Sequence, residues 1–520
     1  MTKRIVSLLM VIAMMVMLAP SFAFADDGDY DLTIAVNRTL FDQTEKASDK
    51  EVWIKAEAMT GVKINWVETL EPDRNERIPL LLASDDLPDV FMMGLSDSYI
   101  VENPELFIPL EDLIEDNCPN IMALYESKIP DWKTYLTYPD GHIYGLMGGY
   151  YTNPLSPIGG TQWINMDWLN KLDMEVPTTL DEFYDMLVAF HDNDMDGDGD
   201  PTNEIPLEIN QSYYGSHVEM YASMWGLPIN HGTWYMINED GDVVGAVDTD
   251  EFREFLEYFY NLGQEGLLDL EGFSATNEQL NANLAANKCG TFWHWEPSIA
   301  AWPAEMEKWP TYEPMAPIAA DGYTAALCGS SPVSAARNNF CITVACEDPA
   351  KALQWYDAIS EHDFSYVAAR GPEGRWWFFD DAGNMVGRQP SYDELDEWGY
   401  DHGIDLGTLM YGQYHPLVYA GLTGDIANQP ESYNARRFRS VLALKDYIAP
   451  TMTQQIMTAE TNEKLTFATD GLDDYIKGFI ASSILNGVTD ETWDTYLEGL
   501  NTYGYDVYVS WYNDKYHGAQ

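Results

Sequence analysis

Acidic side chains crowd one short stretch of the chain, residues 192–204, which reads Asp-Asn-Asp-Met-Asp-Gly-Asp-Gly-Asp-Pro-Thr-Asn-Glu. The carboxylates alternate with other residues, and glycines at 197 and 199 permit sharp turns. Repulsion among so many carboxylates is relieved when a cation lies among their oxygens. Alternating oxygen ligands with a glycine in the turn are how protein loops bind Ca²⁺. We therefore predict a calcium site in this loop.

Two registers of the loop are compatible with this pattern. In the register that we prefer, the ligands are Asp194, Asp196, Asp198, Asp200 through its carbonyl, Asn203 and Glu204. A second register starts at Asp192 and places Gly197 in the turn. A solvated acidic turn without an ion is the alternative. No substrate-pocket motif adjoins the loop, so we expect the ion to be structural.

The first residues have the pattern of a secretory signal peptide. Lys3 and Arg4 precede an apolar run over residues 5–18, and Ala23-Phe-Ala25 offers a cleavage site between small residues. The run is too short to span a bilayer. We expect residues 1–25 to be removed and the mature chain to be secreted, either free, at the cell surface or in a periplasm. No cysteine lies at the cleavage point to carry a lipid anchor.

The bulk composition excludes several partners. The formal net charge is −58, so the surface repels nucleic acid and anionic lipid. The same field disfavours strongly anionic ligands unless a local basic pocket, for example one with Arg370 or Arg375, overrides it. The five cysteines lack metal-type spacing, and buried free thiols are the simplest interpretation. The 17 Trp, 33 Tyr and 19 Phe suit both apolar cores and stacking on sugar rings.

The order of periodic segments predicts an α/β fold. Residues 31–36, 63–67 and 89–93 alternate as strands, and helical patterns separate them. This β-α-β-α-β order implies a parallel, right-handed lobe. Ser48–Glu51 and Thr179–Glu182 are capping-box patterns, and residues 163–173 have a helical pattern. Residues 290–295 are predicted as a short buried strand, residues 373–383 as a hairpin, and the end of the chain as mostly helical.

Several weak motifs follow one another in an order that resembles the extracellular solute-binding proteins of family 1. They include Thr60-Gly-Val-Lys-Ile64, Leu82-Ala-Ser-Asp-Asp-Leu-Pro-Asp89, Phe107-Ile-Pro-Leu-Glu-Asp-Leu-Ile114, Asp140-Gly-His-Ile-Tyr-Gly145 and Pro177-Thr-Thr-Leu-Asp-Glu-Phe183. The chain is similar to the large members that serve ABC importers of alginate and other oligosaccharides, and the resemblance covers nearly the whole mature chain.

This resemblance implies a two-lobed, periplasmic-binding-protein type II fold with the ligand between the lobes. Members with the acidic loop hold a structural Ca²⁺ there, which agrees with the ligands proposed above. The implied function is capture of an oligosaccharide, or another small polar solute, for delivery to membrane permease subunits by a monomer. The expected segments are an N-lobe over 26–148 and 321–372, and a C-lobe over 149–320 and 373–520.

A sugar site needs flat aromatic surfaces and planar polar groups. Trp293 and Trp295 lie in the predicted strand and share one face by alternation; core packing is the alternative for both. The other candidates, each with a structural alternative, are Tyr150, Tyr151, Trp376 (or its neighbour Trp377), Asp85, Asp89 and, more weakly, Tyr411 and Tyr414. For the two aspartates we favour capping of the local backbone over ligand contact.

A secreted glycoside hydrolase or lyase is the rival class. Among 85 acidic residues some carboxylate pair at hydrolase separation is inevitable, so the count decides nothing. The chain has no Gly-x-Ser-x-Gly elbow, no His-Glu-x-x-His helix and no Gly-Lys-Ser/Thr phosphate loop. A calcium-dependent adhesion module would show repeats and all-β patterning. We therefore predict a receptor and not an enzyme.

Overall fold

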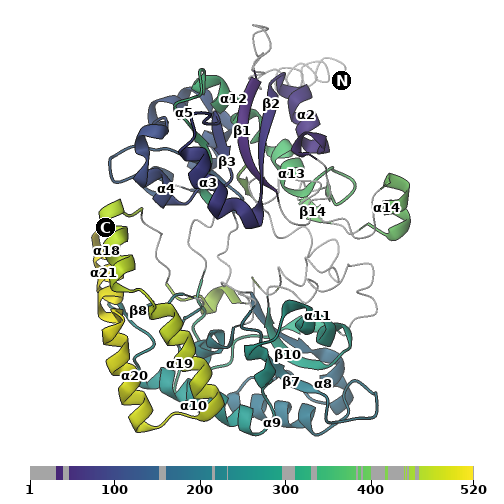
Figure 1. Ribbon diagram of the computed structural model, residues 1–520. Helices are drawn as coiled ribbons and strands as arrows, with labels where there is room; N and C mark the ends of the chain where they lie inside the picture. Colours follow the sequence, from purple (N-terminus) through teal and green to yellow (C-terminus); the bar gives the residue numbers. More distant parts are fainter. Residues whose placement is uncertain are drawn as a thin grey trace, which may run out of the picture.

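The computed structural model consists of two α/β lobes, one above the other in Figure 1, with a group of C-terminal helices along one side. The structure describes residues 31–38, 46–129, 131–151, 160–212, 217–230, 232–294, 311–329, 336–381, 385–387, 390–399, 416–419, 439, 441, 444–450 and 456–518. In the described part, no helix is both long and apolar enough to cross a bilayer.

The N-lobe is built on a five-stranded sheet of order β2-β1-β3-β12-β4. Its strands are β1 (Asp31–Arg38), β2 (Lys63–Leu70), β3 (Val90–Met92), β4 (Leu146–Gly148) and β12 (Ala336–Ile342). The first three are parallel, and β12 runs antiparallel between β3 and β4. Alternation along β1 sends Ile34 into one core and Ala35 into another, because the sheet is covered on both faces.

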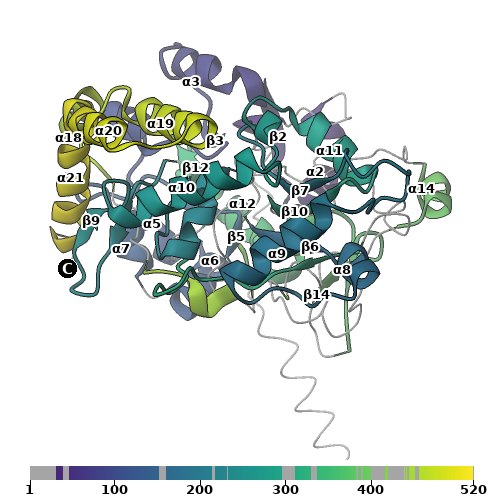
Figure 2. The ribbon, with the colours of Figure 1, turned by 90° about the horizontal axis from the view of Figure 1, so that it is seen from below.

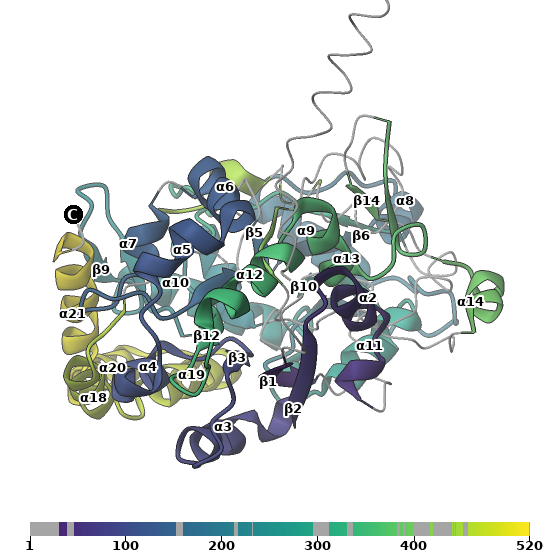
Figure 3. The same ribbon diagram turned by 90° about the horizontal axis from the view of Figure 1, so that it is seen from above.

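Helices from distant parts of the sequence cover the two faces. One face packs on residues of α2 (Glu51–Thr60), α5 (Glu111–Asn117), α6 (Pro119–Lys128), α12 (Pro349–Ile359) and α13 (His362–Arg370). The other face packs on α3 (Arg74–Leu82) and α4 (Asp97–Glu102). Figure 3 shows α3 and α2 on opposite sides of β2.

The C-lobe contains a four-stranded sheet of order β11-β6-β10-β7. Its strands are β6 (Thr161–Asn165), β7 (Ile205–Glu208), β10 (Cys289–His294) and β11 (Tyr312–Pro314). β10 is parallel to β7 and antiparallel to β6. The main core also takes in residues of α8 (Met166–Leu172), α9 (Leu180–His191) and α10 (Asp250–Gln264), while α11 (Asn277–Ala285) contributes to a smaller one.

The C-terminal helices belong mainly to the C-lobe. They are α18 (Ala459–Ala468), α19 (Leu472–Asn486), α20 (Asp490–Thr502) and α21 (Tyr505–Gly518), and they group together in Figure 2. Trp493, Tyr496 and Leu500 of α20 are buried, and the predicted helical end of the chain is confirmed. Phe479 stacks on Tyr496 at 3.8 Å between ring centroids, so α19 and α20 pack through aromatic rings.

In the described part of the chain, two connections between the lobes (the crossings) reach the same edge of the N-lobe sheet. β4 ends at Gly148 and leads into β5 (Tyr150–Tyr151), which pairs with β15 (Val418–Tyr419). In the other direction the chain leaves the C-lobe core after Leu327 and enters β12 at Ala336. The carboxyl ends of β1, β2 and β3 lie at the same edge, so this edge faces the C-lobe.

Several sequence predictions need correction. The Ser48–Glu51 capping box is absent; a 3-10 turn, η1 (Ala47–Asp49), occupies that stretch and α2 begins after Lys50. The segment is held to β2 instead, because the Ala47 amide donates to Glu68 Oε1 at 2.9 Å. The helix predicted over 163–173 begins only at Met166, since its first residues lie in β6 between two partner strands.

The expected segment boundaries also shift. The predicted hairpin exists as β13 (Trp377–Phe379) and β14 (Met385–Gly387). However, Trp376 and Trp377 pack in the N-lobe core and not in the C-lobe. Leu327, expected in the N-lobe, packs in the C-lobe core. The aromatic hairpin therefore remains with the N-lobe, beyond the boundary expected at 372/373.

Candidate functional site

The acidic loop lies between the end of α9 and the start of β7. The predicted capping box starts α9: Thr179 Oγ1 accepts from the Glu182 amide at 3.2 Å, and Glu182 Oε2 accepts from the Thr179 amide. At the other end of the loop, β7 begins directly after Glu204. The loop thus connects a helix and a strand of one core, and its shape affects how the two meet.

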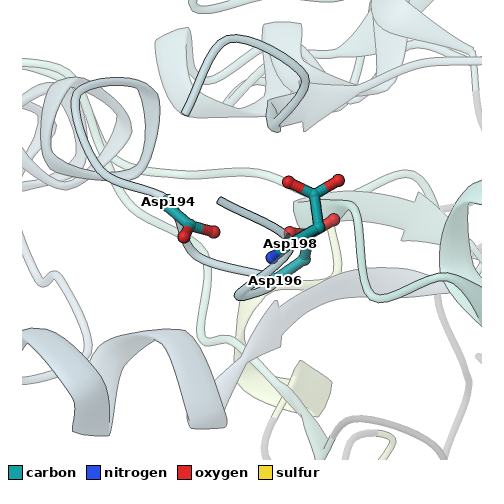
Figure 4. Close-up of side chains that lie close together, drawn as sticks. All are labelled: Asp194, Asp196 and Asp198. Atoms are coloured by element: carbon teal, nitrogen blue, oxygen red, sulfur yellow. Dashed lines mark hydrogen bonds between the residues drawn. The ribbon is translucent and has the colours of Figure 1, made fainter. Parts of the chain in front are cut away.

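Carboxylates converge within this loop. Asp194, Asp196 and Asp198 each offer an oxygen, and these oxygens lie within 4.8 Å of one another. Figure 4 shows Asp194 approaching from one arm of the loop and the other two from the opposite arm. Gly197 and Gly199 have φ values of 84° and 93°, a backbone conformation that other residues rarely adopt. Both glycines that the sequence predicted in turns therefore have a turn conformation, in either register.

The other predicted ligands close the loop. Asn203 Nδ2 donates to Asp198 Oδ2 at 2.7 Å, and Asp200 Oδ1 accepts from the Thr202 amide and hydroxyl. Glu204 Oε1 accepts from the Met195 amide at 2.6 Å. Glu204 Oε2 and Asn203 Oδ1 are enclosed and have no hydrogen-bond partner. Two enclosed oxygens without a hydrogen bond, beside three carboxylates, form a set of ligands that suits a hard cation.

Asp192, the first ligand in the alternative register, lies apart from this group. Its Oδ1 contacts His191 Nδ1 at 2.9 Å, and its side chain is 64% exposed. On the other side of the loop, Lys171 Nζ of α8 donates to the carbonyls of Asp194 and Met195 at 2.6 and 3.4 Å. The lysine therefore holds the loop backbone against α8 without neutralising the carboxylates directly.

Polar side chains line the C-lobe edge that faces the crossings. The carboxyl ends of β7 and β10 and the amino end of β6 lie there. Gln162 Nε2 donates to Thr291 Oγ1 at 3.0 Å, and the Trp163 indole donates to the His294 carbonyl at 2.9 Å. In open α/β sheets, ligands bind beyond the carboxyl ends of the strands. This edge is therefore a candidate ligand surface.

A buried carboxylate lies in the connection that follows β7. Glu219 is fully buried; its Oε1 contacts His217 Nδ1 at 2.9 Å, and its Oε2 accepts from Gln211 Nε2 at 3.3 Å. Burial alone would raise the pKa of Glu219, but the His217 contact and the other hydrogen bonds hold it below its ordinary value. Sequence reasoning missed this group, because neither residue belongs to a recognisable motif.

The N-lobe edge carries arginines that are already engaged. Arg38 Nη1 bonds to Glu68 Oε2 at 2.7 Å, and Arg337 Nη1 bonds to Asp97 Oδ2 at 2.6 Å. Asp97 begins α4 and its Oδ1 also accepts from Asn338 Nδ2 at 2.8 Å. Sequence reasoning missed these pairs too, because their members are more than 25 residues apart in the chain.

The aromatic residues that were predicted to contact the ligand lie in different parts of the structure. Trp293 is 5% exposed and meets Tyr221 edge to face at 5.4 Å in the C-lobe core. Trp376 is buried and lies 5.6 Å from the ring of Trp398. The backbones of Tyr150 and Tyr151 form the crossing strand β5. Trp295, Tyr411 and Tyr414 lie outside the described residues. Ligand contact by these aromatics stays a prediction.

The two aspartates lie near the edge of the N-lobe sheet that is remote from the crossings. Asp89 immediately precedes β3, and its Oδ2 accepts from the Thr33 amide at 2.7 Å. Asp85 is exposed in the turn before it. The hydrogen bond of Asp89 favours the backbone-capping alternative over ligand contact, since the carboxylate holds the starts of β1 and β3 together.

Known proteins resemble this chain over nearly its whole length. No family model matches it. It is 25% identical over 485 residues to the fructooligosaccharide ABC transporter substrate-binding protein FusA of Streptococcus pneumoniae serotype 4. The aligned residues cover 89% of this chain and 86% of FusA. The structure of FusA in complex with kestose matches with a TM-score of 0.77 at 24% identity, covering 94% of this chain and 100% of that one.

Other solved structures share the fold. An extracellular solute-binding protein from Bifidobacterium longum subsp. infantis has a TM-score of 0.78 at 21% identity, covering 95% of this chain and 99% of that one. The alginate-binding protein AlgQ2 without calcium ion has a TM-score of 0.67 at 20% identity, covering 93% and 97%. FusA has also been solved as an EF-hand mutant in complex with fructo-nystose.

This chain shares the two-lobed fold of these solute-binding proteins. FusA is named as a fructooligosaccharide substrate-binding protein of an ABC transporter, and the Bifidobacterium neighbour as an extracellular solute-binding protein. Both names describe substrate-binding proteins and not enzymes. The resemblance to family 1 solute-binding proteins and the predicted two-lobed α/β fold are thereby confirmed.

Proposed function

We propose that this protein is the extracellular substrate-binding protein of an ABC importer. It captures an oligosaccharide between its lobes and presents it, chemically unchanged, to permease subunits in the membrane. The observation that carries the proposal is the similarity to FusA across most of both chains. The facing sheet edges support it, since each bears the polar side chains that sugar hydroxyls require. A ligand that contacts both lobes binds the closed state more tightly than the open state, and it therefore shifts the protein towards the closed state.

The proposal is tested by calorimetric titration of the mature protein with a panel of oligosaccharides, followed by mass spectrometry of the recovered ligand. We expect saturable binding of one ligand per protein and full recovery of the intact sugar. Binding only of a non-sugar solute would correct the ligand class. Turnover of a glycan by the purified protein would instead support the secreted hydrolase or lyase.

We further propose that the loop over residues 194–204 holds a structural Ca²⁺. The ligands would be the six residues that the sequence predicted: Asp194, Asp196, Asp198, Asp200, Asn203 and Glu204. The enclosed, unpartnered oxygens of Asn203 and Glu204 support this assignment. An ion there would supply only charge neutralisation, tying the end of α9 to the start of β7. It would stabilise the folded protein by mass action.

Thermal melting in calcium and in EDTA tests the metal proposal. We expect a higher Tm in calcium, and we expect Asp194→Asn to abolish the difference. Asp192→Asn serves as the matched control, because Asp192 lies outside the convergent group; its Tm should still rise with calcium. An identical Tm for the wild-type protein in both buffers would contradict the assignment. Loss of the calcium effect in Asp192→Asn alone would favour the other register.

A further inference from the structure

Two buried polar side chains in the N-lobe sheet make no hydrogen bond. Asn37 near the end of β1 is 5% exposed, and Thr69 near the end of β2 is 4% exposed. Both the Oδ1 and Nδ2 atoms of Asn37 and the Oγ1 atom of Thr69 are enclosed without a partner. Folded proteins satisfy nearly all buried polar groups. Three such atoms in one place therefore indicate a missing partner.

The two side chains are neighbours on one face of the sheet. Asn37 is the register partner of Thr69 in the parallel pair β1–β2. Alternation places Asn37 on the same face as Ala35, which packs towards α3 and α4. Both residues lie at the carboxyl ends of their strands. This is the edge at which Gly148 leaves for the C-lobe, so the pair lies at the end of the sheet nearest the other lobe.

Charged groups near the pair are already engaged with protein atoms. Arg74, the first residue of α3, donates from Nη2 to the carbonyl of Met93 at 3.1 Å and to that of Gly94. Arg38 is bonded to Glu68. The side chains of the pair itself are neutral, an amide and a hydroxyl.

The chemistry of these atoms selects a particular kind of partner. Asn37 offers two donor hydrogens and an acceptor oxygen, and the Thr69 hydroxyl both donates and accepts. A sugar hydroxyl, which also donates and accepts, satisfies both kinds of atom. A uronate carboxylate accepts only, so it would leave Asn37 Oδ1 without a donor.

We propose that Asn37 and Thr69 form a hydroxyl-binding subsite for a neutral sugar residue of the ligand. The proposal rests on the proposed function and narrows its substrate class to uncharged oligosaccharides. The pair is enclosed in this structure, so a sugar reaches it only when the groups that cover it move away. Closure then removes the bound hydroxyl from water. Each hydrogen bond is stronger in the protein interior than in water.

The substitution Thr69→Val removes the hydroxyl and keeps the shape of the side chain. We expect the Kd for a neutral oligosaccharide that binds the wild-type protein to rise about tenfold or more. We expect the Tm of the ligand-free protein to rise, because an unsatisfied buried hydroxyl has been removed. Asn37→Ala provides a second variant and should weaken binding in the same way.

The same two strands offer a matched control at their other ends. Thr33 and Asn65 are register partners at the amino ends of β1 and β2, remote from the C-lobe. Thr33→Val keeps the backbone amide that bonds to Asp89. This control should leave the Kd unchanged.

Three outcomes would overturn the subsite. If Thr69→Val and Asn37→Ala leave the Kd unchanged while Thr69→Val lowers the ligand-free Tm, an enclosed water is the missing partner. If the wild-type protein binds oligogalacturonate or oligoalginate more tightly than every neutral oligosaccharide, the ligand class is wrong. If it binds none of these sugars, the proposed function fails with the subsite; either of the first two results leaves that function standing.

Discussion

Glu208 places a carboxyl group inside the C-lobe, where it has almost no contact with water. The residue ends β7 and is 1% exposed. Its Oε1 accepts from Asn283 Nδ2 at 3.2 Å, and its Oε2 contacts the thiol of Cys289. Burial raises the pKa of Glu208 to about 8, against the smaller opposing effect of these two hydrogen bonds. The group is therefore largely protonated in the folded protein near neutral pH.

This carboxyl group makes the stability of the protein depend on pH. The pKa is about 8 when folded and 4.5 for the ordinary group, so the folded state binds more protons between these values. The free energy of unfolding should therefore fall as pH rises from about 5 to 8, by up to a few kcal/mol from this group. Glu208→Gln should flatten this dependence, as measured by urea unfolding at pH 5 and pH 8.

An exposed glutamate of the same lobe provides the control. Glu498 lies on the outer face of α20, and Glu498→Gln should keep the wild-type pH dependence. If Glu208→Gln and the wild-type protein lose equal stability between the two pH values, the buried carboxyl is not protonated as described.

At the residue scale, the sequence predicted best those sites whose residues lie close together in the chain. The acidic loop could be predicted because its carboxylates are close in the chain, and three of them do converge. The pairs Arg38–Glu68 and Arg337–Asp97 join distant segments, so no spacing pattern reveals them. The unsatisfied state of Asn37 and Thr69 is likewise visible only once β1 lies beside β2.

At the scale of elements, the C-terminal helices depend on close backbone approaches. Gly504 joins α20 to α21 with φ at 76°, and a Cβ atom there would lie 2.2 Å from the carbonyl oxygen of Ala468. Only glycine fits both the conformation and the contact. The position therefore fixes how the end of α18 meets the start of α21.

Substitution of this glycine should loosen the helical group. We expect Gly504→Ala to lower the free energy of unfolding by more than about 1 kcal/mol, measured by urea denaturation. Gly478 lies inside α19 with nothing within 4 Å of its missing Cβ, so Gly478→Ala should instead stabilise the protein by about 0.5–1 kcal/mol. Equal effects of the two substitutions would contradict this account of the junction.

Elements were predicted well where local signals and tertiary pairing agree. The Thr179–Glu182 capping box and the strand over 290–295 are confirmed, the latter as Cys289–His294. The helical pattern over 163–173 was wrong for its first residues, because ladders with β10 and β11 override local preference there. The capping box at Ser48 failed because a contact with distant β2 holds that stretch.

At the scale of the molecule, the order of elements predicts the parallel N-lobe and the family resemblance implies the two lobes, but the order of the strands in the N-lobe sheet follows from neither. The parallel strands β1, β2 and β3 could be predicted from their alternation with helices. The entry of β12 between β3 and β4 could not, because it brings together segments almost 190 residues apart. The same long-range exchange explains why the hairpin β13–β14 packs with the N-lobe and not, as expected, with the C-lobe.

Small-angle X-ray scattering, with and without a saturating oligosaccharide from the binding panel, tests the central claim most directly. If the lobes close around the sugar, the radius of gyration should decrease when ligand is added and return to its initial value when ligand is dialysed away. An unchanged radius of gyration at saturation would contradict the account, because binding would then occur without movement of one lobe towards the other.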